Sequence, residues 1–188
     1  MAAEDSTLRS RIRRHYGVST SQPFSAARHS EEDAYTDPFD GERKARDQMS
    51  WLIMKGDTLH ANQPKIGSVV IRRKFGIEDP RVFRTTIVGC DDDEVPQRQH
   101  DIHDGWLLLV LRSMVLANSF TQGRSTSFTI TYDLSNVPQS QLRAFRAGAN
   151  GQPYFSAELT IVLSLQEILD ISVVMNGNVI ACDNLDYL

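Results

Sequence analysis

Hydrophobic and polar residues alternate most regularly in the second half of the chain. In STSFTITYD (residues 125–133), Phe128, Ile130 and Tyr132 take every second position, with Ser or Thr between them. Successive side chains of a strand point to opposite faces, so this pattern predicts a half-buried β-strand. Further β-rich stretches predict strands at SWLIM (50–54), KIGSVVIRRKFG (65–76), RVFRTTIVGC (81–90) and YFSAELTIVLSLQ (154–166).

Two connections between these strands are informative. The segment FGIEDP (75–80) holds Gly, Asp and Pro, so the strands on either side of it are predicted to form an antiparallel pair. In DISVVMNGNVIAC (170–182), two β-branched runs flank Asn176-Gly177, the residue pair that a type I′ turn requires. The chain is therefore predicted to close with a β-hairpin.

Helical spacing is found in two places. Apolar residues of DGWLLLVLRSMVLANSF (104–120), including Trp106, Val110 and Met114, recur at helical intervals, which predicts one main buried helix ending between 118 and 123. A second, short helix is predicted over 136–148, with Pro138 in its first turn and Gly148 as its stop. The predicted fold class is therefore α+β, with an antiparallel sheet, these two helices and the closing hairpin.

After Met1-Ala2-Ala3, the first 48 residues have no apolar run longer than two, and they are rich in Ser, Arg, Asp and Glu. Such a segment buries little apolar surface to offset the entropy of ordering it. Residues 1–48 are therefore predicted to be a flexible charged N-terminal arm, and residues 49–188 a single α+β globular domain.

The composition is that of an ordinary soluble protein, with 40% hydrophobic and 23% charged residues in a chain of 188. The first apolar run comes only after residue 50, and the longest one is too short to span a bilayer. We therefore expect an intracellular protein that is not secreted and has no transmembrane segment.

The net charge of −4 is unevenly distributed. Residues 1–28 and 64–84 are basic on balance, whereas residues 89–106 carry six acids and one Arg. Opposite patches of this kind suit association with a charged partner or with further copies of the chain. The predicted contact surface, which could also meet phosphates, consists of Arg9, Arg11, Arg13, Arg14, Arg72, Arg73, Lys74, Arg81 and Arg84. For the residues from 72 to 84, the alternative is a charged sheet edge protected against aggregation.

The acidic loop GCDDDEVPQRQHDIHDGW (89–106) is the stretch with most potential for chemistry. Asp91 to Glu94 could supply oxygen ligands, and His100 and His103 could supply nitrogen ligands, to a metal ion. However, no established metal motif is present, and Asp104 is placed to cap the helix predicted after it. We favour a helix cap and a charged surface, with no metal and no cofactor.

Signatures of covalent catalysis and of phosphate loops are absent. The sequence has no GxSxG, no P-loop and no family signature around Cys90 or Cys182. We therefore expect a protein without enzymatic activity and without a small-molecule substrate.

The order of elements over residues 49–182, together with the segment TITYD, resembles the matrix proteins of rhabdoviruses. The resemblance implies a small, non-enzymatic structural protein of an RNA virus. Such a protein self-associates as a homo-oligomer and bridges the viral nucleocapsid and an anionic membrane surface, in the host cytoplasm and the virion. In this hypothesis the arm contacts a neighbouring copy. One alternative is a nucleic-acid-binding capsid or accessory protein that uses the Arg-rich patches on RNA. A less favoured alternative is a metal-assisted hydrolase that uses residues 91–104.

Overall fold

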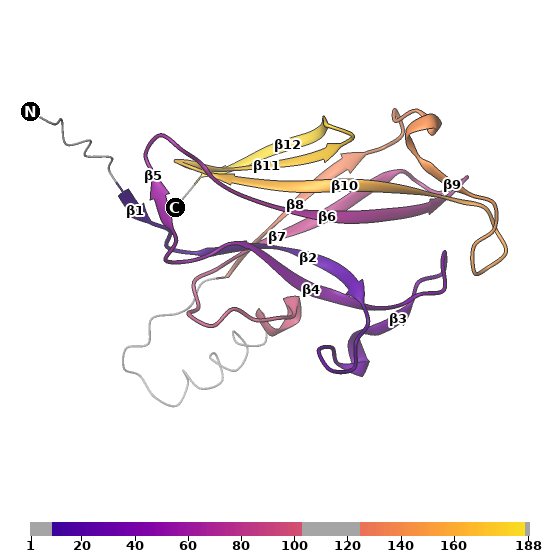
Figure 1. Ribbon diagram of the computed structural model, residues 1–188, viewed down its shortest axis with the longest axis horizontal. Coiled ribbons are helices and arrows are strands. Elements are labelled where there is room, and N and C mark those ends of the chain that lie inside the picture. The colour runs from indigo at the N-terminus through magenta and orange to yellow at the C-terminus, as the bar shows by residue number, and fades with distance from the viewer. Residues whose placement is uncertain (1–8, 103–124, 187–188) are drawn as a thin grey trace, which may run out of the picture.

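The protein is built mainly from β-strands that come from both halves of the chain (Figure 1). The computed structural model describes residues 9–102 and 125–186. All strand pairs are antiparallel. The elements are β1 (Arg9–Arg11), β2 (His15–Pro23), the 3₁₀ turn η1 (Glu31–Asp33), β3 (Ala34–Thr36), β4 (Arg43–Ile53), β5 (Thr58–His60), β6 (Lys65–Gly76), β7 (Val82–Cys90), β8 (Thr126–Asp133), the 3₁₀ turn η2 (Gln139–Gln141), β9 (Arg143–Phe145), β10 (Tyr154–Leu165), β11 (Ile168–Met175) and β12 (Asn178–Asp186).

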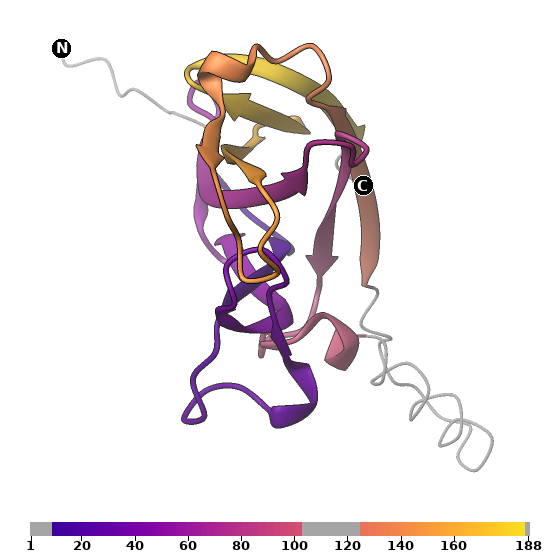
Figure 2. The same ribbon diagram turned by 90° about the vertical axis from the view of Figure 1, so that its right-hand side faces the viewer.

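These strands form two five-stranded sheets and a two-stranded ribbon of β1 and β5. The first sheet has the order β3-β4-β2-β7-β8, and the second has the order β12-β11-β10-β6, with β9 paired to the start of β10. The two sheets diverge toward the end of the molecule where β3 and β9 lie (Figures 1 and 2).

The main hydrophobic core lies between the two sheets. It combines Ile87, Ile130 and Tyr132 of the first sheet with inward residues of the second, such as Leu159 and Ile161. Each of these five residues is at most 3% exposed. Burial of such side chains is the main favourable term in folding, so both sheets depend on each other for stability.

The predicted α+β class is wrong, because strands dominate the described residues. The main helix predicted within 104–120 lies outside these residues, which show a helical turn at 99–102. The short helix predicted over 136–148 is replaced by η2 and β9. Phe145 and Tyr154, on β9 and β10, stack with ring centroids 4.5 Å apart, so tertiary contacts override the weak local helix signal.

The predicted flexible arm is also wrong for residues 9–48, while residues 1–8 lie outside the described part. The strand β2 lies in the middle of the first sheet, between β4 and β7, and its Val18 is fully buried. The predicted boundary between residues 48 and 49 falls inside β4. Single apolar residues at alternate positions are enough for a strand that buries one face, so the lack of apolar runs was misleading.

The closing hairpin is confirmed. Asn176 and Gly177 have φ values of 50° and 79°, as a type I′ turn requires, and they join β11 to β12. The strand predicted at residues 125–133 is confirmed as β8, with Ile130 and Tyr132 buried. The predicted pairing of the strands at 65–76 and 81–90 is wrong, since β6 pairs with β10 and β7 pairs with β2 and β8.

Within residues 9–102 and 125–186, no helix has the length and the apolar character needed to cross a bilayer.

Candidate functional site

Four arginines near the N-terminus were predicted to belong to the contact surface, and they lie on or just after β1. Arg9 pairs in register with His60 of β5. Arg11 is exposed and donates a hydrogen bond to the Gly56 carbonyl, and Arg13 is exposed. The guanidinium of Arg14 forms an ion pair with Asp91, with 2.5 Å between Nε and Oδ1. These residues belong to the folded protein.

The basic residues of β6 and β7 are largely engaged within the chain. Arg72 pairs with Glu158 at 3.2 Å, Arg73 donates to Tyr132, and Lys74 pairs with Asp37 and Asp40. Arg81 lies over the rings of Phe75 and Phe155, and Arg84 is exposed. Because most of these cations already have internal partners, the described residues give little support to a continuous phosphate-binding surface.

The acids of the loop after β7 also find partners within the chain. Lys55 Nζ lies 2.7 Å from Asp93 Oδ1 and also donates to the Asp91 carbonyl. The hydrogen bond between Lys55 and Asp93 lowers the pKa of Asp93 and raises the pKa of Lys55. Trp51 anchors the same loop by donating from Nε1 to the Pro96 carbonyl at 2.8 Å. The charge segregation seen in the sequence is thus partly neutralised by folding.

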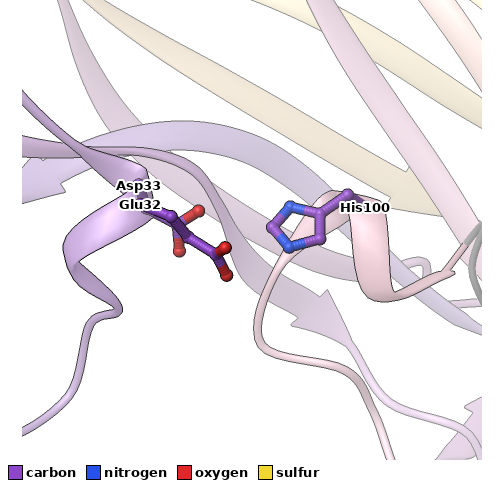
Figure 3. Close-up of side chains that lie close together, drawn as sticks. All are labelled: Glu32, Asp33 and His100. Atoms are coloured by element: carbon purple, nitrogen blue, oxygen red, sulfur yellow. The ribbon is translucent and has the colours of Figure 1, made fainter.

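One group of side chains has the composition of a metal site. Figure 3 shows Glu32 and Asp33 of η1 facing His100, and one ligand atom of each lies within 4.8 Å of the others. However, the guanidinium of Arg98 lies 2.5 Å from Glu32 and 3.6 Å from Asp33, and it also pairs with Asp101. The hydrogen bond from Arg98 lowers the pKa of Glu32. A side-chain cation therefore already supplies the positive charge here, and the group is a salt-bridge cluster.

The sequence favoured a helix cap over a metal site in the acidic loop, and the described residues of this loop do not gather the ligands that the metal alternative requires. His100 lies with Glu32 and Asp33, two residues that the sequence analysis assigned to the arm. His103 and Asp104, the predicted second ligand and helix cap, lie outside the described residues. A hydrolase based on residues 91–104 therefore gains no support.

A groove of about 1120 Å³ opens where the two sheets diverge. One wall is β2 from Ser19 to Pro23 and the other is β6 from Val69 to Lys74, with Phe83 and Met175 among the further lining residues. The groove is larger than most small-ligand pockets, which measure roughly 300–1,000 Å³.

An ionic cluster joins the two walls at one end of this groove. Lys44 of β4 and Lys74 of β6 both pair with Asp37, at 2.5 Å and 3.1 Å, and both also pair with Asp40. Burial raises the pKa of Asp37, but the hydrogen bonds from Lys44, the Phe39 amide and Lys74 outweigh it, so the pKa is lowered overall. Two lysines and two aspartates thus neutralise one another.

The outer face of the second sheet carries a surface without charge. This surface consists of two neighbouring rows of side chains that run across β6, β10, β11 and β12. The residues of each row occupy paired positions on adjacent strands. Val70 and Val179 at its margins are 56% and 61% exposed. We call this surface the neutral face; it comprises Val70, Thr160, Val174 and Val179 in one row and Ser68, Val162, Ser172 and Cys182 in the other.

Neither the groove nor the neutral face was predicted from the sequence. The groove depends on Asp37, Asp40 and Lys44 from the predicted arm, and its walls come from strands about fifty residues apart. The neutral face could have been partly anticipated, because Ser68, Val70, Thr160 and Val162 occupy alternate positions opposite the apolar core residues.

In the part of the chain that the structure describes, the fold is mostly β-sheet, with an open groove between diverging sheets and an uncharged outer sheet face. The chain belongs to the family described as a domain of unknown function, DUF8568, which matches residues 11–104. The match begins at the end of β1, continues through β7 and crosses the position where the arm was predicted to end. No curated protein and no solved structure matches the chain.

Proposed function

We propose that this protein has no enzymatic activity and self-associates through the neutral face, which packs against the neutral face of a second copy. The observation that carries the proposal is the row of Val70, Thr160, Val174 and Val179, in which the two outer valines are exposed and the two middle residues are half-buried. Exposed apolar patches on soluble proteins commonly mark interaction sites, and two sheets pack well through β-branched side chains. The other face of the same strands is already buried in the core.

The charges at the two ends of the neutral face favour a second copy as the partner. The ion pair of Arg72 and Glu158 lies at one end, and exposed Asp170 lies beyond the other. A two-fold axis that crosses the strands reverses their direction in the partner. It would bring the end with Arg72 toward the partner's end with Asp170, while the uncharged rows meet in the middle.

Self-association is also what the resemblance to matrix proteins implies, although the route differs from the predicted one. The arm that was expected to contact a neighbour is folded from residue 9 onward, so a sheet face replaces it in our proposal. Binding to a nucleocapsid, to RNA or to an anionic membrane stays a prediction. The internal pairing of Arg14, Arg72 and Lys74 makes self-association the better supported function.

The proposal is tested by sedimentation velocity of the full chain and of the variant Val179→Glu over a wide range of concentrations. A carboxylate at position 179 would be buried against the uncharged face of the partner without a counter-ion, so the variant should stay monomeric where the wild type is dimeric. The matched control is Val82→Glu, which alters an exposed valine of β7 and should leave the dimer intact.

Cys182 provides a second measurement, because it is exposed on the neutral face, whereas Cys90 is buried. A fluorophore attached to Cys182 should be quenched by its counterpart when dimers form. A wild-type chain that is monomeric at every concentration, or a Val179→Glu variant that dimerises as well as the wild type, would overturn the proposal.

A further inference from the structure

The groove between β2 and β6 exposes the backbone edges of two strands. It contacts every residue from Ser19 to Pro23 and every residue from Val69 to Lys74. Successive side chains of a strand point to opposite faces, so a cavity that touches each residue in turn lies along the backbone edge of the strand.

The strand pairing agrees with this interpretation. The hydrogen-bonded ladder between β2 and β7 stops at Val18. After Val18, β2 pairs only with β4, along one of its two edges. The strand β6 pairs with β10 along its whole length. Within residues 9–102 and 125–186, no strand pairs with the second edge of either segment.

The two walls are held apart at a fixed separation because they are joined at both ends. At one end β6 crosses β4, where a Cβ on Gly67 would lie 2.5 Å from the Leu52 carbonyl oxygen. At the other end Lys74 pairs with Asp37 and Asp40 of the loop that follows β3. The edges between these joints are open over about five residues, or about 17 Å at the rise of a β-strand.

We infer that the groove binds an extended, uncharged peptide segment of another protein, which pairs as an added strand with the free edges of β2 and β6. Figure 1 shows β2 and β6 running in the same direction, so one inserted strand can be antiparallel to both. Main-chain hydrogen bonds of this kind provide affinity in strand addition, while the pockets for alternate side chains provide specificity.

The chemistry of the walls selects an uncharged segment, because each charged lining residue already has a contact within the chain. Lys44, Lys74, Asp37 and Asp40 neutralise one another, with Glu42 beside Lys44, and Arg72 is paired with Glu158. Arg73 is bonded to Tyr132 and to the Arg84 carbonyl, and Arg143 lies over the Phe145 ring. The β2 wall is lined by the uncharged residues Ser19, Thr20 and Ser21. A charged side chain at the centre of the bound segment would lose water without gaining a partner, which is unfavourable.

The inference is tested by selecting linear twelve-residue peptides from a display library against the full-length protein. Selected peptides should have uncharged central residues and should protect the amides of β2 and β6 from hydrogen exchange. The matched control is the same peptide methylated on alternate backbone nitrogens, which removes the edge hydrogen bonds. Successive N–H groups of a strand point to opposite neighbours, so methylation in either alternating register removes the bonds to one wall and should weaken binding by about tenfold or more.

Two serine variants then locate the site on the protein. Ser21→Glu places a carboxylate in the groove and should weaken peptide binding by about tenfold or more. The control is Ser127→Glu, which changes an exposed residue of β8 outside the groove and should bind peptide like the wild type. Val179 is outside the groove, so Val179→Glu should bind peptide normally, and failure of self-association would leave this inference intact.

Three results would overturn the inference. They are the absence of any selected peptide, equal binding by Ser21→Glu and the wild type, and selected peptides that tolerate methylation in either register. Binding of oligosaccharides in the groove in place of peptides would overturn it as well.

Discussion

Arg73 on β6 donates a hydrogen bond from Nε to the hydroxyl group of Tyr132 on β8, 2.8 Å away, and thereby joins the second sheet to the first. The Nη2 atom of Arg73 also donates to the Arg84 carbonyl and to the hydroxyl of Thr85. Tyr132 and Thr85 are each 2% exposed. A residue that the sequence assigned to a contact surface thus holds the two sheets together near the core.

Replacing Tyr132 with Phe should therefore destabilise the protein. The change keeps the buried ring but leaves the Arg73 Nε without its acceptor, which typically costs about 1–3 kcal/mol. Urea denaturation measures the free energy of unfolding. Tyr35→Phe is the control, because the Tyr35 ring is half-buried beneath Arg46 and should lose little. Equal stability of Tyr132→Phe and the wild type would contradict a structural role for the Arg73 bond.

Asp37 should make stability depend on pH in the acidic range. Its pKa is lowered in the folded state, so it stabilises the fold above the ordinary aspartate pKa of about 3.9. This contribution is lost as the pH falls from about 4 through the lower folded pKa, because the folded state then takes up the proton.

The variant Asp37→Asn should accordingly be less stable than the wild type at pH 7. It should also lose less stability than the wild type between pH 5 and pH 3, as measured by urea denaturation at each pH. Glu167→Gln, a change at an exposed residue, serves as the control and should follow the wild type. Parallel pH profiles of Asp37→Asn and the wild type would rule out the role given to Asp37.

Gly67 should tolerate no side chain. A Cβ at this position would lie 2.5 Å from the Leu52 carbonyl oxygen and 2.8 Å from its Cβ, where β6 crosses β4. Gly67→Ala should lower the free energy of unfolding by about 1–3 kcal/mol, as overpacking usually does. The control is Gly76→Ala, whose Cβ would meet the flexible carboxylate of Asp79 at 3.1 Å. If both variants have the same melting temperature, the crossing is looser than described.

The cluster around Arg98 should not respond to metal ions. The guanidinium of Arg98 already lies between Glu32, Asp33 and Asp101, so added Zn²⁺ or Ca²⁺ should leave the melting temperature of the wild type unchanged. Arg98→Ala should melt at a lower temperature, since Asp33 is only 4% exposed and would keep its charge without that cation. A rise in the wild-type melting temperature with Zn²⁺ would show that the metal displaces Arg98.

The strands with continuous or strictly alternating patterns could be predicted from the sequence. This holds for β8, β10 and the hairpin of β11 and β12, because side-chain alternation and the Asn-Gly turn are local properties of the chain. The prediction of the fold class was wrong because the local sequence signal was weak at β9 and because β2 buries only isolated apolar residues. The partners of each strand could not be predicted from the sequence either, since β2 pairs with β7, which lies about seventy residues further along the chain.

The sequence by itself determined that residues 125–133, 154–166 and 170–182 form strands, and that the chain turns at Asn176-Gly177. Only the tertiary structure decided which strands are neighbours and which charges neutralise one another. Lys74 meets Asp37, and Arg14 meets Asp91, across long stretches of chain. The physical reason is that a strand pattern fixes which face is buried, whereas pairing and ion contacts depend on how distant segments share one core.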